Sequence, residues 1–492
     1  MKTAVIELPP IRPTVAPYSC GVLNKIIKRY EPQCEIIDLN LDFWDYIWTE
    51  YFGLWDKCAG NAIYHLSKEK LYEAVRTLKQ NRSSEQAVQE AFKTLQRKSS
   101  LYEEQYNISM RFGRVEFPDE VYNNLLEFCS QKTDNIFGEY LDSVMDQKEL
   151  KNYDMLFLSV MVKEQLVCAC TFSKLMTRNY GTRPRIVIGG AYITRFSEEL
   201  KQAGISQLFD VWLPGLAEVT ISNLFGCNNT DNSSYEYDTD LGALKLEQYY
   251  SLGKIFPLMA SRFCYYHRCA FCDNAYNYRG RKIDIQTPEA VFEQMKNANA
   301  TYGVDRFCFL DDCLSDSFMN RLSELIISSN YQFIWTANAR FTNRLTDIKM
   351  ANKLAKGGCR ELFLGLESYS QPELDRMNKG TKIDWVQPTI VNLKKSGITV
   401  YVSVMVGFPG QGVEDFEATY NFLRENETCI DMVDVNVFFK TPFFSGDSIA
   451  LVELTEEDIK LRDKQTKCFF NQLMAWVTDK KKSPSFYRRH SW

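Results

Sequence analysis

Three cysteines lie within nine residues of this chain, at Cys264, Cys269 and Cys272, and the next cysteine is Cys308. They stand in a polar and aromatic loop, residues 261–272, with the sequence SRFCYYHRCAFC. Iron–sulfur clusters are held by cysteine thiolates, and three thiolates can bind three of the four irons of a 4Fe-4S cluster. The spacing therefore predicts a cluster whose fourth iron is open to a small-molecule ligand.

Two other interpretations of these residues stay open. His267 could complete a set of four zinc ligands, although structural zinc sites usually draw ligand pairs from two separated segments. The cysteines could also be unligated thiols in a core, but a C-x4-C-x2-C pattern in a polar loop is unlike the spacing of apolar packing residues. The pattern favours the cluster over both alternatives.

The second half of the chain alternates apolar strands with helical patterns six times. Helical stretches such as 288–302 and 414–424 separate strands expected near 255–263, 306–312, 332–340, 359–368, 399–408 and 432–441. Six such units make a partial (β/α)6 barrel, two short of the closed eight. Active sites of these barrels lie at the carboxyl ends of the strands, so we expect the three cysteines, which follow the first strand, on that face.

Polar groups stand at the carboxyl ends of the later strands. They are Asp311 and Asp312, then Asn338 and Arg340, then Glu367 and Ser368, and finally the turn GFPG at residues 407–410. Carboxylates can receive an amino group or ribose hydroxyls, an arginine can pair with a carboxylate, and a glycine-proline turn lets backbone approach an aromatic base. Together these groups suit a ligand in which an amino acid is joined to a nucleoside.

The first part of the chain predicts a doubly wound α/β domain of Rossmann type. We expect strands at residues 3–8, 34–39, 154–161, 185–188 and 208–213, with a helix near 21–30. A helical insertion, about 41–150, interrupts this pattern. Its aromatic stretch at 42–55 is interpreted as core packing against the sheet, in preference to a ligand-facing role.

Composition indicates a folded enzyme of several domains. The 492 residues are 45% hydrophobic and 25% charged, and the net charge of −5 gives no general attraction to nucleic acid or anionic membrane. The longest apolar runs are strand-sized, and the amino terminus lacks the apolar core of a signal peptide. With 15 cysteines and no such signal, we expect the chain in a reducing cytoplasm.

Several short segments carry a resemblance to a known family. In the second half they are Ser261-Arg262 before Cys264, CAFC at 269–272, FLDD at 309–312, GLES at 365–368, RMNKGT at 376–381 and VGFPG at 406–410. In the first half they are PP at 9–10, IIDLN at 36–40, IGG at 188–190 and DVWLPGLAE at 210–218. On these residues the chain resembles the radical S-adenosylmethionine (SAM) superfamily, in the branch with an amino-terminal domain of cobalamin-binding type.

The resemblance implies roles for individual residues. Cys264, Cys269 and Cys272 would ligate the cluster, and SAM would chelate the open iron through its amino and carboxylate groups. Reduction would then split SAM into a 5'-deoxyadenosyl radical that abstracts hydrogen from an unactivated C–H bond. Asp312 and Glu367 would contact the SAM amino group or ribose, Arg340 its carboxylate, and the backbone around Phe271 and Gly407 its adenine.

The chain departs from the family pattern in two places. The usual cysteine spacing is C-x3-C-x2-C, and this chain has one additional residue. No Asp-x-His-x-x-Gly motif is present, and the histidines are His65, His267 and His490, so that motif supplies no axial ligand to cobalt. The resemblance favours cobalamin held instead by loops after strands, at 160–165, 189–194 and 215–218, with Gly189, Gly190, Gly215 and Glu218 as contact residues.

We predict four regions along the chain. They are a cobalamin-binding-type Rossmann-like domain at 1–227, a linker at 228–250 that begins in the polar run NNTDNSS, a radical SAM partial barrel at 251–450, and a helical tail at 451–492.

The leading functional hypothesis is cobalamin-dependent methylation of an unactivated carbon in a peptide or small metabolite of natural-product biosynthesis. The insertion and the segments CAFCDN and YGVDRF are similar to enzymes that mature ribosomally made peptides. A flavodoxin or ferredoxin would supply electrons, and no nucleic acid or membrane partner is expected.

Two alternatives differ in chemistry. One is a peptide epimerase or other hydrogen-transfer enzyme, with Cys313, Cys308 or Cys359 as thiol donor and the Rossmann-like domain as scaffold. The other is a non-catalytic zinc-binding module.

Overall fold

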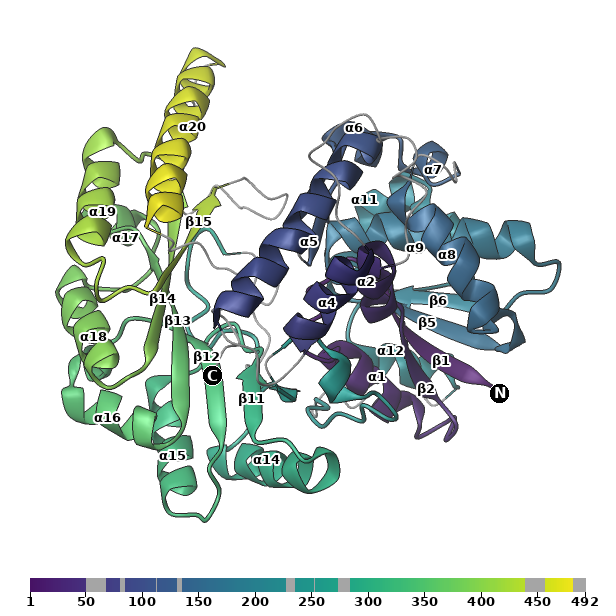
Figure 1. Ribbon diagram of the computed structural model, residues 1–492, viewed down its shortest axis with the longest axis horizontal. Helices are drawn as coiled ribbons and strands as arrows, with labels where there is room; N and C mark the ends of the chain where they lie inside the picture. The colour runs from purple at the N-terminus through teal and green to yellow at the C-terminus, as the bar shows by residue number, and fades with distance from the viewer. Residues whose placement is uncertain are drawn as a thin grey trace. The chain divides into compact units, whose positions relative to one another are not determined.

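The structure, a computed structural model, describes residues 1–49, 68–79, 85–111, 113–130, 135–226, 235–251, 253–272, 284–438 and 456–480. The chain divides into two compact units that meet in sequence between Ile255 and Phe256. Each unit is built on a parallel β-sheet with helices packed against it (Figure 1).

The first unit contains a five-stranded sheet in the order β2-β1-β5-β6-β7. Its strands are β1 (Thr3–Glu7), β2 (Glu35–Asp38), β5 (Met155–Ser159), β6 (Arg185–Gly189) and β7 (Val211–Leu213). All neighbouring strands pair in parallel. The two central strands, TAVIE and MLFLS, are buried along their whole length, which explains why they read as continuous apolar runs.

Helices connect these strands in the expected alternation. They are α1 (Tyr18–Ile27), α9 (Lys163–Asn179), α10 (Ala191–Arg195), α11 (Ser197–Gln202) and α12 (Ala217–Leu224). The prediction of a doubly wound, Rossmann-like first domain is confirmed. Helix α1 begins three residues before the predicted start at residue 21, and β7 is shorter than predicted because residues 205–208 form a 3-10 helix.

The insertion between β2 and β5 is mostly helical, as predicted. Its helices are α2 (Leu39–Thr49), α4 (Lys68–Lys79), α5 (Glu85–Tyr106), α6 (Asp119–Asn123), α7 (Leu125–Phe128) and α8 (Ile136–Gln147). A short hairpin of β3 (Ser109–Arg111) and β4 (Arg114–Glu116) was not anticipated. Each strand has three residues, which is too few for a periodic signal, and Gly113 supplies the turn with a positive φ of 76°.

The aromatic stretch of the insertion is core. Phe43, Trp44 and Trp48 are at most 1% exposed, and the indole of Trp44 donates a hydrogen bond to the Ile11 carbonyl at 2.8 Å. The Tyr140 ring packs edge-on against Phe43 with centroids 5.3 Å apart. The core-packing interpretation therefore holds for these residues, while the rest of the stretch, residues 50–55, lies outside the described part of the chain.

The second unit contains a six-stranded sheet in the order β15-β14-β13-β12-β11-β8. The strands are β8 (Ile255–Leu258), β11 (Arg306–Phe309), β12 (Ile334–Ala339), β13 (Cys359–Glu367), β14 (Thr399–Val406) and β15 (Met432–Val437). Pairing from β11 to β15 is parallel. All six predicted strands are present and neighbouring strands are consecutive, as in a partial barrel.

Helices of the second unit lie along the outer side of this sheet (Figure 1). They are α14 (Pro288–Tyr302), α15 (Asp316–Ile327), α16 (Ile348–Lys356), α17 (Gln371–Arg376), α18 (Ile383–Lys395) and α19 (Val413–Glu425). The last described helix, α20 (Glu456–Asp479), packs on β14 and β15 and stacks Phe469 on Phe416 of α19, with ring centroids 4.0 Å apart. A short pair, β9 (Ser261–Arg262) with β10 (Asp284–Ile285), begins the cysteine loop.

Residues 235–250, within the predicted linker, pack on the first unit. The Tyr18 hydroxyl of α1 donates to the Tyr237 carbonyl at 3.1 Å, and Lys28 pairs with Asp240 at 2.6 Å. Tyr249 and Tyr250 are almost fully buried. The start of the linker, residues 228–234, lies outside the described residues, and the domain boundaries remain predictions.

Among the described residues, no helix combines the length and apolar character needed to cross a membrane.

Candidate active site

The cysteines lie in a loop, residues 261–272, that we call the cluster loop. Its start is held by Asp311, which follows β11. The Asp311 carboxylate accepts hydrogen bonds from the backbone N–H of Ala260 at 2.9 Å, and from the backbone N–H and hydroxyl of Ser261, each at 2.6 Å. Burial raises the pKa of Asp311 to about 6, against the opposing effect of these hydrogen bonds. These hydrogen bonds therefore fix the residues at which the cluster loop leaves the sheet.

The three cysteines are half-buried, and their thiols differ in acidity. A hydrogen bond from the Cys313 thiol lowers the pKa of Cys264 to about 5 despite burial, with backbone hydrogen bonds from His267 and Tyr266 acting in the same direction. Burial raises the pKa of Cys269 to about 11. Among the described residues, no three histidine, cysteine or acidic side chains converge as ligands of one ion, whereas the cysteines of a 4Fe-4S cluster each bind a different iron.

A segment after β13, residues 377–380, holds the cluster loop from the other side, and we call it the cradle segment. The Ala270 N–H donates to the Met377 carbonyl at 2.9 Å, and the Tyr266 hydroxyl donates to the Asn378 carbonyl at 2.8 Å. The Asn378 side-chain amide donates back to the Arg268 carbonyl at 2.8 Å. A Cβ at Gly380, where φ is +67°, would lie 2.2 Å from the Tyr266 hydroxyl, so the approach requires glycine.

Arg340 follows β12 and lies between the cluster loop and the cradle segment. Its guanidinium is 3.2 Å from the centroid of the Tyr266 ring, and its Nη2 donates to the Lys379 carbonyl. The side chain is 7% exposed, yet its Nη1 atom has no hydrogen-bond partner within the described residues. A buried guanidinium N–H without a partner is costly, so this atom fits an anionic group supplied by a ligand.

Glu367 ends β13 at a bulge, with a positive φ of 64°. Its Oε1 forms an ion pair with the Lys379 ammonium at 2.8 Å, and its Oε2 accepts a hydrogen bond from the Ser403 hydroxyl at 3.2 Å. The Lys379 ammonium also lies 5.4 Å from the centroid of the Phe271 ring. Lys379 therefore joins Glu367, a predicted SAM-contact residue, to Phe271 of the cluster loop.

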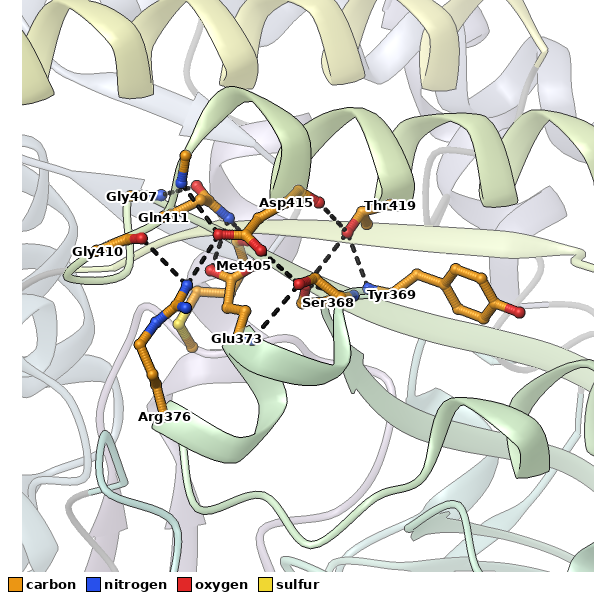
Figure 2. A network of polar contacts seen from close by, with 12 residues as sticks. Ser368, Tyr369, Glu373, Arg376, Met405, Gly407, Gly410, Gln411, Asp415 and Thr419 are labelled. Atoms are coloured by element: carbon orange, nitrogen blue, oxygen red, sulfur yellow. Dashed lines mark hydrogen bonds and ion pairs between the residues drawn. The ribbon is translucent and has the colours of Figure 1, made fainter.

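Gly407 directly follows β14 and has a φ of +81°, and its N–H donates to the Gln411 side chain at 2.7 Å (Figure 2). The Gln411 amide in turn donates to Glu373 at 2.9 Å. A Cβ at Gly407 would lie 2.7 Å from Thr466 of α20. The turn after β14 is therefore held both by its own polar network and by close packing.

The same network joins the ends of β13 and β14 (Figure 2). Arg376 of α17 pairs with Asp415 of α19 at 2.8 Å and donates to the Gly410 carbonyl at 3.1 Å. The Tyr369 N–H donates to the Thr419 hydroxyl at 2.8 Å. Burial raises the pKa of Glu373 to about 7. These contacts fix the turn containing Gly407 relative to the strand end that carries Glu367.

Of the predicted SAM-contact residues, three meet around the cysteines. Arg340, Glu367 and Phe271 are connected through Tyr266 and Lys379, as described above. Gly407 is linked to them by its neighbour Phe408, whose ring lies edge-on to Phe271 with centroids 6.4 Å apart. Asp312 is exposed, beside the buried Asp311. The roles assigned to these residues stay predictions.

The three cysteines named as thiol donors occupy different environments. Cys313 is 4% exposed and hydrogen-bonded to Cys264. Cys308 is half-buried within β11. Cys359 is fully buried at the start of β13, at the opposite edge of the sheet from the cluster loop, and burial raises its pKa.

The predicted cobalamin loops follow β5, β6 and β7 at one edge of the first sheet. Gly190 has a φ of +107°, and a Cβ there would lie 2.4 Å from the Val160 carbonyl. A Cβ at Gly189 would lie 2.9 Å from the Leu213 carbonyl. Both glycines are therefore required by the packing of neighbouring strand ends, whatever ligand the edge binds.

The rest of this edge offers both apolar and polar groups. Met161 and Val162 are each 40% exposed at the end of β5. The Gly215 N–H donates to the Thr194 hydroxyl at 2.9 Å, and the Glu218 carboxylate accepts from the Glu236 N–H at 3.1 Å. Exposed apolar side chains beside a glycine-rich backbone fit a large flat ligand with an apolar face, such as a corrin ring.

Sequence reasoning missed three residues of the site, Asp311 as an anchor, Tyr266 and Lys379. Lys379 stands in the segment RMNKGT, which carried part of the family resemblance but had no assigned chemistry. A positive charge beside glycine in that segment was the available signal.

Comparison with known proteins agrees with this geometry. Residues 259–423 match the family model of the Radical SAM superfamily. An uncharacterized methyltransferase of Pyrococcus horikoshii is 28% identical over 188 residues, 37% of this chain and 39% of that protein. The bacteriochlorophyllide d C-12(1)-methyltransferase of Chlorobaculum tepidum is 26% identical over 198 residues, 39% of this chain and 42% of that protein. The chain thus aligns with about two fifths of the length of these relatives.

A solved structure covers more of the chain. The radical S-adenosylmethionine methyltransferase TsrM from Kitasatospora setae, bound to tryptophan substrate and a SAM analog, superposes with a TM-score of 0.54 over 88% of this chain and 72% of its own. The same protein was also solved with cobalamin and a 4Fe-4S cluster. Sequence identity is 12%, so the likeness concerns the fold. Residues 259–423 of the chain thus match the Radical SAM superfamily, and this domain together with the preceding Rossmann-like unit shares its fold with TsrM.

Proposed function

We propose that this protein uses a 4Fe-4S cluster and SAM to methylate an unactivated carbon with the help of cobalamin. The observation that carries the proposal is the Nη1 atom of Arg340, buried without a partner beside the loop of three cysteines. An anionic ligand group at that place would satisfy this atom, and SAM offers a carboxylate. The relatives named above are methyltransferases, which supports methyl transfer as the reaction class.

We assign a separate binding role to each residue of the site. Cys264, Cys269 and Cys272 would hold the cluster, Arg340 would pair with the SAM carboxylate, and Glu367 would accept from its amino group or ribose. The backbone at Gly407 would face the adenine. The cluster, when bound, supplies an electron that splits SAM to a radical able to abstract hydrogen from carbon, a reaction beyond ordinary side chains. The protein positions the reactants and excludes water.

Cobalamin is proposed for the edge of the first sheet formed by the loops after β5, β6 and β7. Gly189, Gly190, Gly215 and Glu218 are the expected contact residues, and Met161 and Val162 would lie against the corrin. When bound, cobalamin supplies a methyl group to a substrate radical. The solved relative TsrM binds cobalamin, which supports this assignment.

The substrate is proposed to be a peptide or a small metabolite. TsrM was solved with tryptophan, and the Chlorobaculum enzyme acts on a bacteriochlorophyllide, so the relatives do not share one substrate class. A flavodoxin or ferredoxin in the cytoplasm would deliver the electrons.

The test is metal analysis of protein purified without oxygen from cells supplied with cobalamin. We expect about four irons per chain, the number in one such cluster, together with one cobalt and SAM cleavage to 5'-deoxyadenosine under reduction. A variant with Cys264→Ala, Cys269→Ala and Cys272→Ala should lose iron and cleavage but keep cobalt. Iron without cobalt would favour hydrogen transfer in place of methylation, and zinc in place of both metals would refute the proposal.

A further inference from the structure

Lys379 belongs to the segment RMNKGT, whose chemistry neither the sequence nor the proposed function explains. Lysine is rarely buried unless it is paired. Here the side chain is 8% exposed and its ammonium contacts the Glu367 carboxylate at 2.8 Å, itself 9% exposed. Burial lowers the pKa of Lys379, but the charges of Glu367 and Cys269 outweigh that effect and the pKa is raised. The lysine is therefore a buried cation paired with a buried carboxylate.

The surrounding chain is shaped to admit this cation. A Cβ at Gly365, two residues before Glu367, would lie 2.7 Å from the Lys379 ammonium and 2.9 Å from the Glu367 carboxylate. Glu367 itself has a left-handed φ of 64° at a bulge, a conformation that is strained for a residue other than glycine. Its other carboxylate oxygen accepts from Ser403 at 3.2 Å. The backbone conformation of Glu367, the bulge in β13 and the hydrogen bond from Ser403 together orient this carboxylate toward Lys379.

The ammonium also faces the cluster loop. It lies 5.4 Å from the centroid of the Phe271 ring, in a loop position between Cys269 and Cys272. The cations whose charges act on Cys269 are Lys379 and Arg340. The backbone of the same lysine accepts a hydrogen bond from Arg340. One residue thus connects the carboxylate expected to bind SAM with the thiolates expected to bind iron.

We propose that Lys379 is a positioning residue with two effects: it holds Glu367 in the orientation that binds SAM, and its charge makes the cluster easier to reduce. This inference rests on the proposed function. The step concerned is transfer of one electron from the external donor to the cluster. That electron then passes to SAM, and its C5'–S bond breaks to give methionine and the 5'-deoxyadenosyl radical. A buried positive charge nearby stabilises the added negative charge because the surroundings screen it weakly.

Three variants separate the two effects. Lys379→Met removes the charge and keeps much of the side-chain length, Lys379→Arg keeps the charge, and Glu367→Gln removes the charge of the partner. Lys394→Met is the matched control, because Lys394 pairs with Asp431 on the surface of the same unit and is 40% exposed. Each protein is purified without oxygen as the full chain and assayed for iron. The midpoint potential of the cluster is measured without SAM, and KM and kcat are then measured for SAM cleavage.

We expect Lys379→Met to shift the midpoint potential to a more negative value. It should also raise KM for SAM by roughly tenfold, the change that corresponds to losing about one hydrogen bond's worth of binding free energy through a misplaced Glu367. Lys379→Arg should keep the potential near that of the wild type. Glu367→Gln should raise KM without making the potential more negative, and Lys394→Met should change neither quantity.

Unchanged potential and KM in an iron-loaded Lys379→Met variant would overturn the inference. If that variant retains no iron, the decision passes to Lys379→Gln, which also removes the charge but keeps a polar side chain. An unchanged potential together with an unchanged KM in iron-loaded Lys379→Gln would overturn the inference in the same way. Failure of the proposed function itself has a different signature, because the wild-type protein would then bind no iron or leave SAM intact.

Discussion

The two parallel sheets both end in buried carboxyl groups, but these groups have different partners. In the first unit, Glu7 ends β1 and Asp38 ends β2, and they are 3% and 8% exposed; in the second unit, Glu367 ends β13 and is 7% exposed. Burial is thus similar for all three. Glu7 bonds to the Cys20 thiol and the Gln165 amide, and Asp38 to the Tyr249 hydroxyl, whereas Glu367 pairs with the ammonium of Lys379.

The partners of these buried carboxyl groups are neutral side chains in the first unit and a lysine ammonium at Glu367. With neutral partners, burial raises the pKa of Glu7 to about 8 and that of Asp38 to about 6. In the second unit two buried cations, Arg340 and Lys379, stand beside the cysteines. That edge suits thiolates and a ligand carboxylate. At the edge of the first unit the hydrogen-bond partners of the buried acids Glu7 and Asp38 are neutral side chains, which suits a ligand bound without strong charge pairing.

Gly190→Ala should lower the free energy of unfolding more than the other substitutions, and it should affect the first unit alone. The φ of +107° and the 2.4 Å approach to the Val160 carbonyl leave no room for a Cβ. We expect a loss of about 4 kcal/mol in unfolding free energy, measured by urea denaturation, with cobalt lost and iron retained. Gly181→Ala is the control, since a Cβ there meets no atom within 4 Å. Loss of iron along with cobalt would mean that the two edges are not independent.

Asp311→Ala should destabilise the second unit by about 3 kcal/mol, because three donors of Ala260 and Ser261 lose their acceptor. Iron content should fall as well, since the cluster loop starts at these residues. The neighbouring Asp312→Ala removes an exposed carboxylate and should change stability by no more than about 0.5 kcal/mol. Equal effects of the two substitutions would show that the anchoring role was assigned wrongly.

The pH dependence of stability in a Glu7→Gln variant tests the raised pKa of Glu7, which is buried among neutral partners. The pKa of Glu7 is raised in the folded state, from 4.5 to about 8. The stability contributed by this group is therefore fully present below about pH 4.5, and it is lost as the pH rises towards 8. Between pH 6 and 8.5 the melting temperature of the wild type should fall, and the Gln variant should flatten that slope. The exposed Glu414→Gln should leave it unchanged, and a wild-type melting temperature that rises over this window would contradict the assignment.

Gly365→Ala should have the smallest effect on stability, about 1 kcal/mol, because the overlapping atoms are the side-chain ends of Lys379 and Glu367, and the flexible lysine can move. The displaced ammonium should leave Glu367 and raise KM for SAM without changing cobalt content. A variant with lower stability and normal KM would indicate that the lysine reaches Glu367 by another path.

Much of the architecture could be predicted from local pattern. The strands of both sheets were located because buried parallel strands are continuous apolar runs, as in Met155–Ser159 and Thr399–Val406. Helix α14 begins at Pro288 and ends at Tyr302 as predicted, with Thr287 as its N-cap and Gly303 after its last turn. Element boundaries were less predictable where a turn of 3-10 helix or a three-residue hairpin replaced a periodic segment.

The sequence by itself determined the spacing of the three cysteines, the succession of strands along the chain and the glycines at strand ends. Each of these features can be recognised from a few neighbouring residues. Only the tertiary structure brought Asn378 to Arg268 and Lys379 to the ring of Phe271, across more than a hundred residues of chain. Such pairs form because strand packing closes the intervening loops, and no local preference of either residue specifies its partner. The chemistry of the cysteines could therefore be read from the chain, while the charges that control it could not.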